Sequence, residues 1–217
     1  MKPLLIAHRG DTIHFPENTL DAFQSAFDLG AGGIECDIQL LEGKLIVIHD
    51  YLFDQTKTYP ILKNVLEKFS HRGRIEIEVK SFTYDILSPL THLLSQYPKG
   101  DFEITTSELF LVPELRKQLA QATIGVIFKA SEFEPWMPDG FVERKIIETT
   151  KTLRTNVAHV STSLISHDLV KKLHKEGIKV HTHLGISATV ANYQEFCDLG
   201  VDQCTFDNIN LLTEIRK

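Results

Sequence analysis

Residues 33–50 read Gly-Ile-Glu-Cys-Asp-Ile-Gln-Leu-Leu-Glu-Gly-Lys-Leu-Ile-Val-Ile-His-Asp. Apolar and acidic side chains alternate with a period of two over Gly33–Ile38, which predicts a β-strand. The turn residues Glu42-Gly43 come next, and the apolar run Leu45–Ile48 then predicts a short extra strand. A strand of this kind, with acids on one face, needs neighbours that bury its other face.

Similar strand patterns alternate with helical patterns along the whole chain. The expected strands are Leu4–Ala7, Gly33–Ile38, Arg74–Val79, Phe102–Thr105, Thr123–Ile127, Val157–Val160, Ile178–Thr182 and Gln203–Phe206. The expected helices, with apolar residues three and four apart, are Thr19–Leu29, Ile61–Phe69, Tyr84–Leu94, Leu109–Leu119, Glu143–Leu153, His167–His174, Val190–Leu199 and Ile209–Ile215. Eight such units predict an α/β fold, a TIM (β/α)₈ barrel in which residues 1–217 form one compact domain. A doubly wound sheet is the alternative, but the first strand–helix junction lacks its Gly-x-Gly-x-x-Gly.

Composition narrows the class of protein. The 217 residues are 42% hydrophobic and 24% charged, which suits one globular domain with a full core. The net charge of −6 argues against a nucleic-acid partner, which would need a basic face. It leaves room for a small phosphate substrate, because a bound metal and basic side chains can reverse the local field.

The cysteines and the N-terminal segment indicate in which cellular compartment the protein is expected to reside. Cys36, Cys197 and Cys204 show no Cys-x-x-Cys spacing, so we expect neither a disulfide framework nor a thiolate zinc site. The first apolar run is too short for a signal peptide, and no stretch reaches the length of a membrane span. These features predict a cytoplasmic protein.

Three polar segments each fall at the carboxyl end of an expected strand. They are Ala7–Gly10, followed by Pro16–Thr19; Glu35–Asp37, followed by His49-Asp50; and Glu76–Lys80. Catalytic groups of TIM barrels lie at that end of the strands. The three segments are therefore expected to converge on one site.

Carboxylates in two of these segments suggest a metal centre. Glu35 and Asp37 lie two apart on a strand and point to one face, while Cys36 points to the other. Acids so close repel each other unless a cation lies between them, and Glu78 on the next strand would complete an all-oxygen set. Such ligands favour Mg²⁺, Ca²⁺ or Mn²⁺ over Zn²⁺. We expect one divalent cation here.

Basic side chains accompany the carboxylates. Arg9 and Lys80 could hold a phosphate group, and His8 and His49 could take and give protons near neutral pH. Each piece also has an ordinary structural explanation. Glu-x-Lys is commonly a surface ion pair of small energetic value, and His-Arg-Gly recurs at residues 71–73, in an expected turn. Order, spacing and a shared barrel end favour the functional interpretation.

The combination resembles the glycerophosphodiester phosphodiesterase family. The resemblance rests on His8-Arg9-Gly10, Pro16–Thr19, Glu35-x-Asp37, Val47-x-His49-Asp50 and Glu78-x-Lys80, within roughly the first 80 residues. It implies a TIM-barrel phosphoric diester hydrolase that cleaves a small-molecule glycerophosphodiester into glycerol phosphate and an alcohol.

The resemblance also implies a role for each matching residue. By motif position, His8 and His49 are the catalytic acid–base pair. The metal ligands are Glu35, Asp37 and Glu78, and the phosphate contacts are Arg9 and Lys80. Glu17 and Asn18 are expected to orient the His8–Arg9 loop rather than touch substrate.

The chain departs from the family pattern in three places. The small domain that often follows the His-Asp motif is missing, because Tyr51–Pro60 passes directly into a helix. The Trp-Thr-x-Asn stretch near the seventh strand is replaced by His181-Thr182-His183-Leu184, and the later Thr-Asp by Thr205-Phe206-Asp207. His181 and His183 could line the alcohol side of the pocket, as polar contacts or a second metal position. The alternative is that both satisfy polar groups at the barrel rim.

Two rival functions remain open at this point. One is a lipid phosphodiesterase of the lysophospholipase D or sphingomyelinase D kind, although no apolar surface helix or basic interfacial patch is evident. The other is a non-catalytic ligand-binding barrel. In the enzyme, one histidine would deprotonate water or a neighbouring substrate hydroxyl, and the other would protonate the leaving alcohol.

Overall fold

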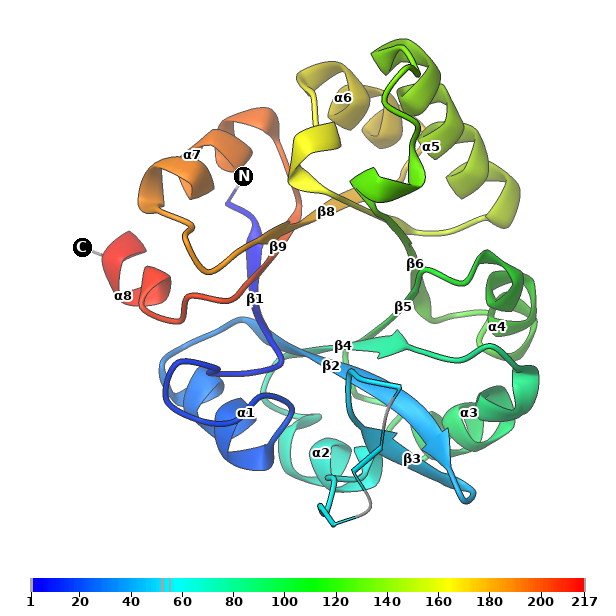
Figure 1. The fold of residues 1–217 in the computed structure, drawn as a ribbon, viewed down its shortest axis with the longest axis vertical. Coiled ribbons are helices and arrows are strands. Elements are labelled where there is room, and N and C mark those ends of the chain that lie inside the picture. The colour runs from blue at the N-terminus through cyan, green and yellow to red at the C-terminus, as the bar shows by residue number, and fades with distance from the viewer. Residues whose placement is uncertain (1, 52, 55, 217) are drawn as a thin grey trace.

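The computed structural model describes residues 2–51, 53–54 and 56–216. Eight parallel strands close into a barrel and the helices surround it, as Figure 1 shows along the barrel axis. The barrel strands are β1 (Leu4–His8), β2 (Gly33–Leu41), β4 (Arg74–Val79), β5 (Phe102–Thr106), β6 (Thr123–Phe128), β7 (Val157–Val160), β8 (Lys179–Leu184) and β9 (Gln203–Phe206). The helices are α1 (Leu20–Asp28), α2 (Leu62–Phe69), α3 (Leu87–Ser95), α4 (Val112–Gln118), α5 (Asp139–Leu153), α6 (His167–Lys175), α7 (Val190–Leu199) and α8 (Leu211–Ile215). The expected TIM barrel is confirmed.

Strand β1 closes the barrel, because it pairs in parallel with both β2 and β9. Its pairing with β2 ends at the couple His8 and Glu35. Beyond that point β2 continues, and β3 (Lys44–Val47) pairs with it antiparallel from Ile38 to Leu41. The hairpin therefore extends β2 past the barrel rim and carries the chain to His49 above the strand ends.

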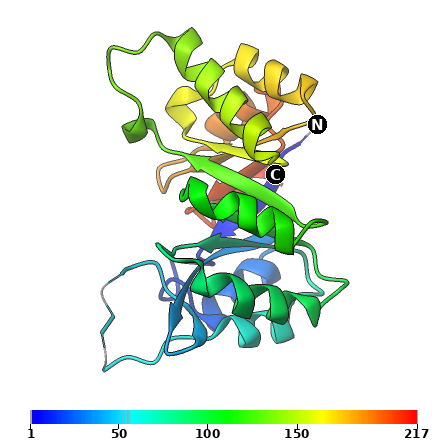
Figure 2. The same ribbon diagram turned by 90° about the vertical axis from the view of Figure 1, so that its right-hand side faces the viewer.

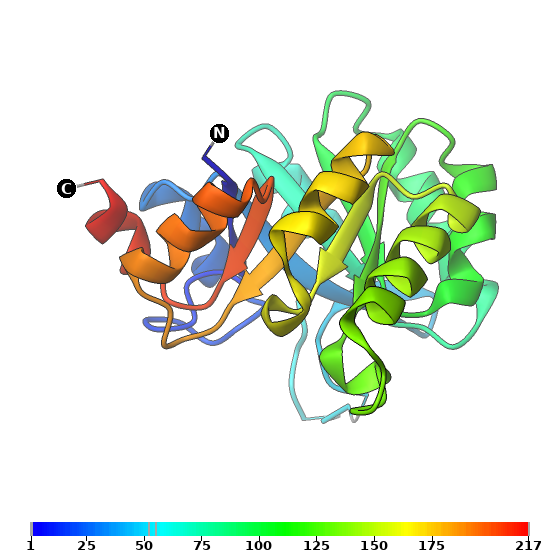
Figure 3. The same cartoon turned by 90° about the horizontal axis from the view of Figure 1, so that it is seen from above.

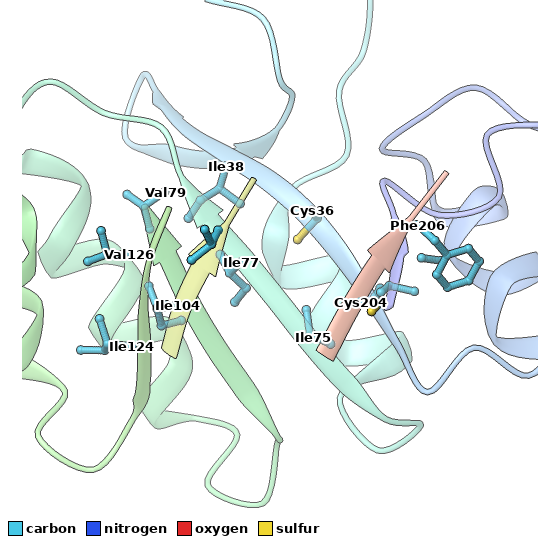
Figure 4. Close-up of a cluster of buried hydrophobic side chains, with 14 of the residues drawn as sticks. Cys36, Ile38, Ile75, Ile77, Val79, Ile104, Ile124, Val126, Cys204 and Phe206 are labelled. Carbon is cyan, nitrogen blue, oxygen red and sulfur yellow. The ribbon is translucent and has the colours of Figure 1, made fainter. Parts of the chain in front are cut away.

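Alternation along the strands separates an apolar outer layer from a polar interior. Figure 4 shows Cys36 and Ile38 of β2 with Ile75, Ile77 and Val79 of β4, all buried in one hydrophobic cluster. The acidic residues between them must point the other way, toward the barrel axis. TIM-barrel interiors are usually filled by branched apolar side chains. Here the interior holds buried carboxylates, threonines and a histidine instead.

The ends of several elements differ from the sequence-based expectation. Strand β2 runs three residues beyond Ile38, because β3 supplies it with hydrogen-bond partners. Helix α5 begins at Asp139 instead of Glu143, since Pro138 occupies the N-cap and Gly140 obscures the apolar periodicity of the first turn. Helix α8 begins at Leu211, later than expected.

The segment between β3 and α2 is where a small inserted domain would lie, and the sequence predicts none there. Its described residues between 48 and 60 form no helix or strand, and α2 follows directly. Residues 52 and 55 of the Tyr51–Pro60 stretch lie outside the described residues. Figures 2 and 3 show the described part of this segment and the segment between β6 and α5 extending from the same end of the barrel. That end is where the parallel strands finish.

Gly10 lets the loop after β1 fold back onto α1. Its φ is +86°, and a Cβ atom there would lie 2.7 Å from the backbone carbon of Ala22 and 2.8 Å from its Cβ. The next residue, Asp11, donates its backbone N–H to the Ala22 carbonyl at 3.0 Å. A side chain at position 10 would thus force this loop away from the helix.

We expect Gly10→Ala to destabilise the fold more than Gly43→Ala does. Both positions have positive φ, but a Cβ at Gly43 (φ +77°) would meet nothing within 4 Å. Backbone strain should cost about 1–2 kcal/mol in each variant. The clash with α1 should add about 1–3 kcal/mol to the first alone. Urea unfolding of both variants measures the difference, and equal losses would contradict the close approach.

Candidate functional site

A cavity of about 290 Å³ opens at the carboxyl end of the barrel strands. Six of the seven residues predicted for catalysis, metal binding or phosphate contact line it, namely His8, Arg9, Glu35, His49, Glu78 and Lys80. The seventh, Asp37, is fully buried beside them. The remaining lining residues are Glu76, Ile127, Phe128, Lys129, His159, Ser161, His183 and Thr205. The volume is at the lower end for small-ligand sites.

Glu35, Asp37 and Glu78 meet on neighbouring strands. Asp37 of β2 stands opposite Glu78 of β4 in the sheet register, and one oxygen from each of the three carboxylates lies within 4.8 Å of the others. Across the described residues, neither Glu35 Oε1 nor Asp37 Oδ1 has a hydrogen-bond partner, although both are buried. Buried carboxylate oxygens that face one another fit a hard divalent cation.

Glu35 carries the clearest electrostatic consequence of this crowding. Burial raises its pKa, and the nearby Asp37, Glu76 and Glu78 raise it further, to well above the ordinary value; Arg9 only partly offsets them. A buried ionised carboxylate is costly without a compensating charge.

Arg9 and Lys80 supply positive charge to the same cluster. Arg9 Nε lies 3.1 Å from Asp37 Oδ2, and Lys80 Nζ lies 3.0 Å from Glu78 Oε1 and 3.5 Å from Asp37 Oδ1. Burial alone would lower the pKa of Lys80, but Glu78 and Asp37 outweigh it and raise that pKa. Both side chains therefore stay charged at the cavity wall.

Glu17 and Asn18 lie against the loop that carries Arg9. Glu17 accepts hydrogen bonds from Arg9 Nη1 at 2.9 and 3.1 Å. The Asn18 backbone N–H donates to the Arg9 carbonyl at 3.0 Å, and its side-chain amide donates to Asp37 Oδ2 at 3.0 Å. Arg9 and Asn18 both have positive φ, of 56° and 59°. Such backbone conformations persist where the surroundings hold them, often at functional sites.

Asp207 is a site residue that the sequence analysis missed. It follows β9 and hydrogen-bonds His8 Nδ1 at 2.6 Å and His183 Nε2 at 3.0 Å. Burial alone would raise its pKa, but these hydrogen bonds outweigh burial and hold the pKa well below the ordinary value. The signal was available, since Asp207 is an acid at a strand end, the criterion that selected the other segments.

His49 has a carboxylate partner of its own. Its Nδ1 lies 2.9 Å from Asp50 Oδ1, and the side chain is 36% exposed. In both His8 and His49, a carboxylate on Nδ1 leaves Nε2 as the second ring nitrogen available to a ligand.

His181 and His183, which the sequence analysis grouped together, lie at different depths. His183 lines the cavity, and its ring centroid is 4.3 Å from that of His8. His181 is fully buried in the barrel interior, where it contacts Thr205 and Glu103. Residues two apart share a strand face, but His181 lies one layer of side chains further into the barrel than His183.

Known proteins match both the sequence and the fold. The sequence profile of the glycerophosphoryl diester phosphodiesterase family matches residues 8–59. A glycerophosphodiester phosphodiesterase of Caldanaerobacter subterraneus subsp. tengcongensis is 30% identical over 172 residues, which cover 63% of this chain and 71% of that protein.

Two solved structures share the whole barrel. A glycerophosphodiester phosphodiesterase from Thermotoga maritima superposes with a TM-score of 0.78 at 21% identity, covering 100% of this chain and 99% of its own. A phosphodiesterase from Oleispira antarctica, in complex with its product sn-glycerol-3-phosphate, has a TM-score of 0.81 at 18% identity and covers 100% and 98%.

The barrel and these relatives define the class of protein first: it is a phosphoric diester hydrolase. The length and identity of the Caldanaerobacter match then identify the family. The chain belongs to the glycerophosphoryl diester phosphodiesterase family. Of the helices that the structure describes, none has the length and apolar character required to cross a membrane.

The raised pKa of Glu35 predicts how stability depends on pH when no divalent ion is present. A carboxyl group with a higher pKa in the folded state stabilises the fold below its unfolded pKa, and that contribution is lost as pH rises toward the folded value. The unfolding free energy of protein in chelator should therefore fall with rising pH, by up to about 1.4 kcal/mol per pH unit from this group.

Glu35→Gln should remove that dependence. Urea unfolding from about pH 5 to about pH 8 compares the variant with the parent and with Glu195→Gln, an exposed substitution on α7. A stability difference between parent and Glu35→Gln that stays constant over the range would contradict the shift.

Proposed function

We propose that this chain hydrolyses a water-soluble glycerophosphodiester to glycerol phosphate and an alcohol, with a divalent cation, and with His8 and His49 as acid and base. The observation that carries the proposal is the common cavity. It is lined by both histidines, by Glu35 and Glu78, and by the basic side chains of Arg9 and Lys80. The names of the relatives, and the product held by the Oleispira enzyme, support the choice of substrate.

Glu35, Asp37 and Glu78 would hold the cation. Their crowding and the two buried oxygens that lack a hydrogen-bond partner among the described residues support this assignment. The all-oxygen set suits Mg²⁺ or Ca²⁺, with Mn²⁺ as a further candidate. When bound, such an ion supplies Lewis-acid stabilisation of charge on a phosphate oxygen.

His8 and His49 would move the protons. Asp207 and Asp50 each bind an Nδ1, which favours the tautomer that leaves Nε2 free to accept a proton. One histidine takes the proton of the attacking oxygen and the other gives a proton to the leaving alcohol. In this scheme the low pKa of Asp207 keeps an anion beside His8 when that ring becomes positive.

Arg9 and Lys80 would bind the remaining phosphate oxygens. A guanidinium has five N–H donors and an ammonium three, so each keeps donors beyond its carboxylate partners. Their charges would offset the extra negative charge that develops on the phosphoryl group in the transition state. Glu17 and Asn18 would set the position of Arg9 through the contacts described above.

Replacing either histidine tests the acid–base assignment. His8→Ala and His49→Ala should each lower kcat by about 10²–10⁴, the usual contribution of a positioned acid or base. The assay is release of glycerol phosphate from glycerophosphocholine and glycerophosphoethanolamine. His71→Ala is the matched control, because it alters the second His-Arg-Gly, which lies in the turn before β4. A His8/His49 double variant with full activity would rule the scheme out.

Metal removal tests the carboxylate site. Chelator should abolish hydrolysis, and adding back Mg²⁺, Ca²⁺ or Mn²⁺ should restore it and raise the Tm, since a ligand that binds only the folded state stabilises it. Glu78→Gln should raise the ion concentration required for half-maximal activity by about 10-fold or more. Losing a direct ligand should cost at least as much as losing a residue that only hydrogen-bonds a ligand.

Glu67→Gln, an exposed change on α2, serves as the control for the metal experiment and should leave the requirement unchanged. Hydrolysis that persists in chelator at the untreated rate would exclude a divalent cation from the reaction.

A further inference from the structure

A second group of potential ligands lies inside the barrel. Glu76, His159 and His181 come from β4, β7 and β8, and one ligand atom from each lies within 4.8 Å of the others. His159 and His181 are opposite each other in the sheet register, and their rings stack with centroids 4.0 Å apart. Glu76 and His159 also line the cavity, so the group is reached from the mouth of the barrel.

The distances in this group differ from those of hydrogen bonds. His159 Nδ1 lies 3.4 Å from Glu76 Oε1, and His181 Nε2 lies 3.7 Å from Glu76 Oε2. Neither pair forms a hydrogen bond, because the first lacks the required geometry and the second is too long. Ligands at about 2.0–2.2 Å from one tetrahedral ion stand about 3.4 Å apart. The two pairs end on different oxygens of Glu76, so the carboxylate would bind the ion through both, and one of the nearly parallel imidazole rings would turn toward the ion on binding.

His159 Nδ1 is also a buried nitrogen without a hydrogen-bond partner among the described residues. A buried nitrogen without a partner can bind an ion without giving up a hydrogen bond.

His181 has the outer partner that metal-binding histidines usually have. Its Nδ1 lies 3.4 Å from Glu103 Oε1, while its Nε2 faces Glu76 and lies 2.6 Å from the Thr205 hydroxyl. Glu103 is held in turn by Arg74 Nη1 at 2.8 Å and by the Gln203 amide. In the tautomer that donates from Nδ1 to Glu103, Nε2 is left for the ion and is strengthened as a ligand, while the Gln203 amide, 3.3 Å from Nδ1, keeps its bonds to Glu103.

We propose that Glu76, His159 and His181 form a second metal site, which binds a borderline divalent ion such as Zn²⁺ or Co²⁺. Two imidazoles and one carboxylate favour such ions, whereas the three carboxylates nearer the mouth favour hard ones. The proposal goes beyond the hydrolysis proposed above and does not depend on its substrate.

A third cluster, His8, His183 and Asp207, is the main competitor for such an ion. There the nitrogen–oxygen distances are 2.6 and 3.0 Å, which are hydrogen-bond lengths. An ion would have to displace both hydrogen bonds. In the Glu76 group an ion would displace one short hydrogen bond, that between His181 Nε2 and the Thr205 hydroxyl at 2.6 Å, while His159 Nδ1, which has no partner among the described residues, would give up none.

The test is Co²⁺ titration of chelator-treated protein, followed by visible absorption and by metal content after gel filtration. The parent should show a bound Co²⁺ with the spectrum of an imidazole-ligated ion. His159→Asn and His181→Asn should each weaken binding at least about 10-fold, and Glu103→Gln about 10–100-fold. Circular dichroism checks folding. If His181→Asn fails to fold, the cobalt titration of His159→Asn decides the outcome, because the His159 side chain is less completely buried.

Three controls separate this site from its neighbours. His71→Asn and His183→Asn should keep the cobalt spectrum, and so should Glu78→Gln, which removes only a ligand of the carboxylate site. Loss of the spectrum in His183→Asn, or its retention in His159→Asn, would overturn the proposal. Because the readout is the spectrum, a failure of hydrolysis leaves it unaffected.

Discussion

Repulsion among buried carboxylates is the constraint on which the rest of this site depends. Strands β2 and β4 are neighbours in register, so Glu35 stands beside Glu76 and Asp37 beside Glu78. All four point into the barrel, where water is scarce and charge is poorly screened. Such an arrangement is stable only if protons, basic side chains or bound cations compensate the charge. The surrounding residues can be understood as meeting that need.

Compensation comes at two levels of the barrel. Near the mouth, Arg9 and Lys80 reach over the strand ends to Asp37 and Glu78. Deeper inside, hydroxyls of Thr105 and Thr205 donate to Glu76, and the imidazoles face its oxygens. The apolar core lies outside this column, between the strands and the helices, so that hydrophobic burial stabilises the fold without entering the site.

The same charges prepare the mouth for an anionic ligand. Arg9 lies in a loop of unusual backbone conformation. Two backbone hydrogen bonds hold that loop: the Asn18 N–H donates to the Arg9 carbonyl at 3.0 Å, and the Arg9 N–H donates to the Glu35 carbonyl at 3.1 Å. Two histidines, each backed by a carboxylate, open onto the same cavity. Positioning of this kind reduces the reorganisation required when a substrate binds.

Local sequence was enough to predict the barrel, because strand alternation and helix periodicity are short-range properties that the burial of one face imposes. It also indicated which segments carry chemistry, since strand ends with acids, basic residues and histidines stand out from apolar runs. The starts of α3 and α4 were wrong because a 3₁₀ turn precedes each helix, and those of α5 and α8 were wrong where a glycine or polar residues blurred the periodicity.

Tertiary structure alone decided which polar residues meet across the barrel. Asp207 hydrogen-bonds His8, which lies 199 residues away in the sequence. Glu76, His159 and His181 lie on three different strands and meet inside the barrel. Such contacts depend on how the strands are staggered when the barrel closes, and on the depth of each residue along the axis. Local periodicity specifies the face of a strand but neither its height in the barrel nor the residue opposite. For that reason His181 and His183, two residues apart on one strand face, have different surroundings in the folded chain: His181 is buried in the barrel interior and His183 lines the cavity.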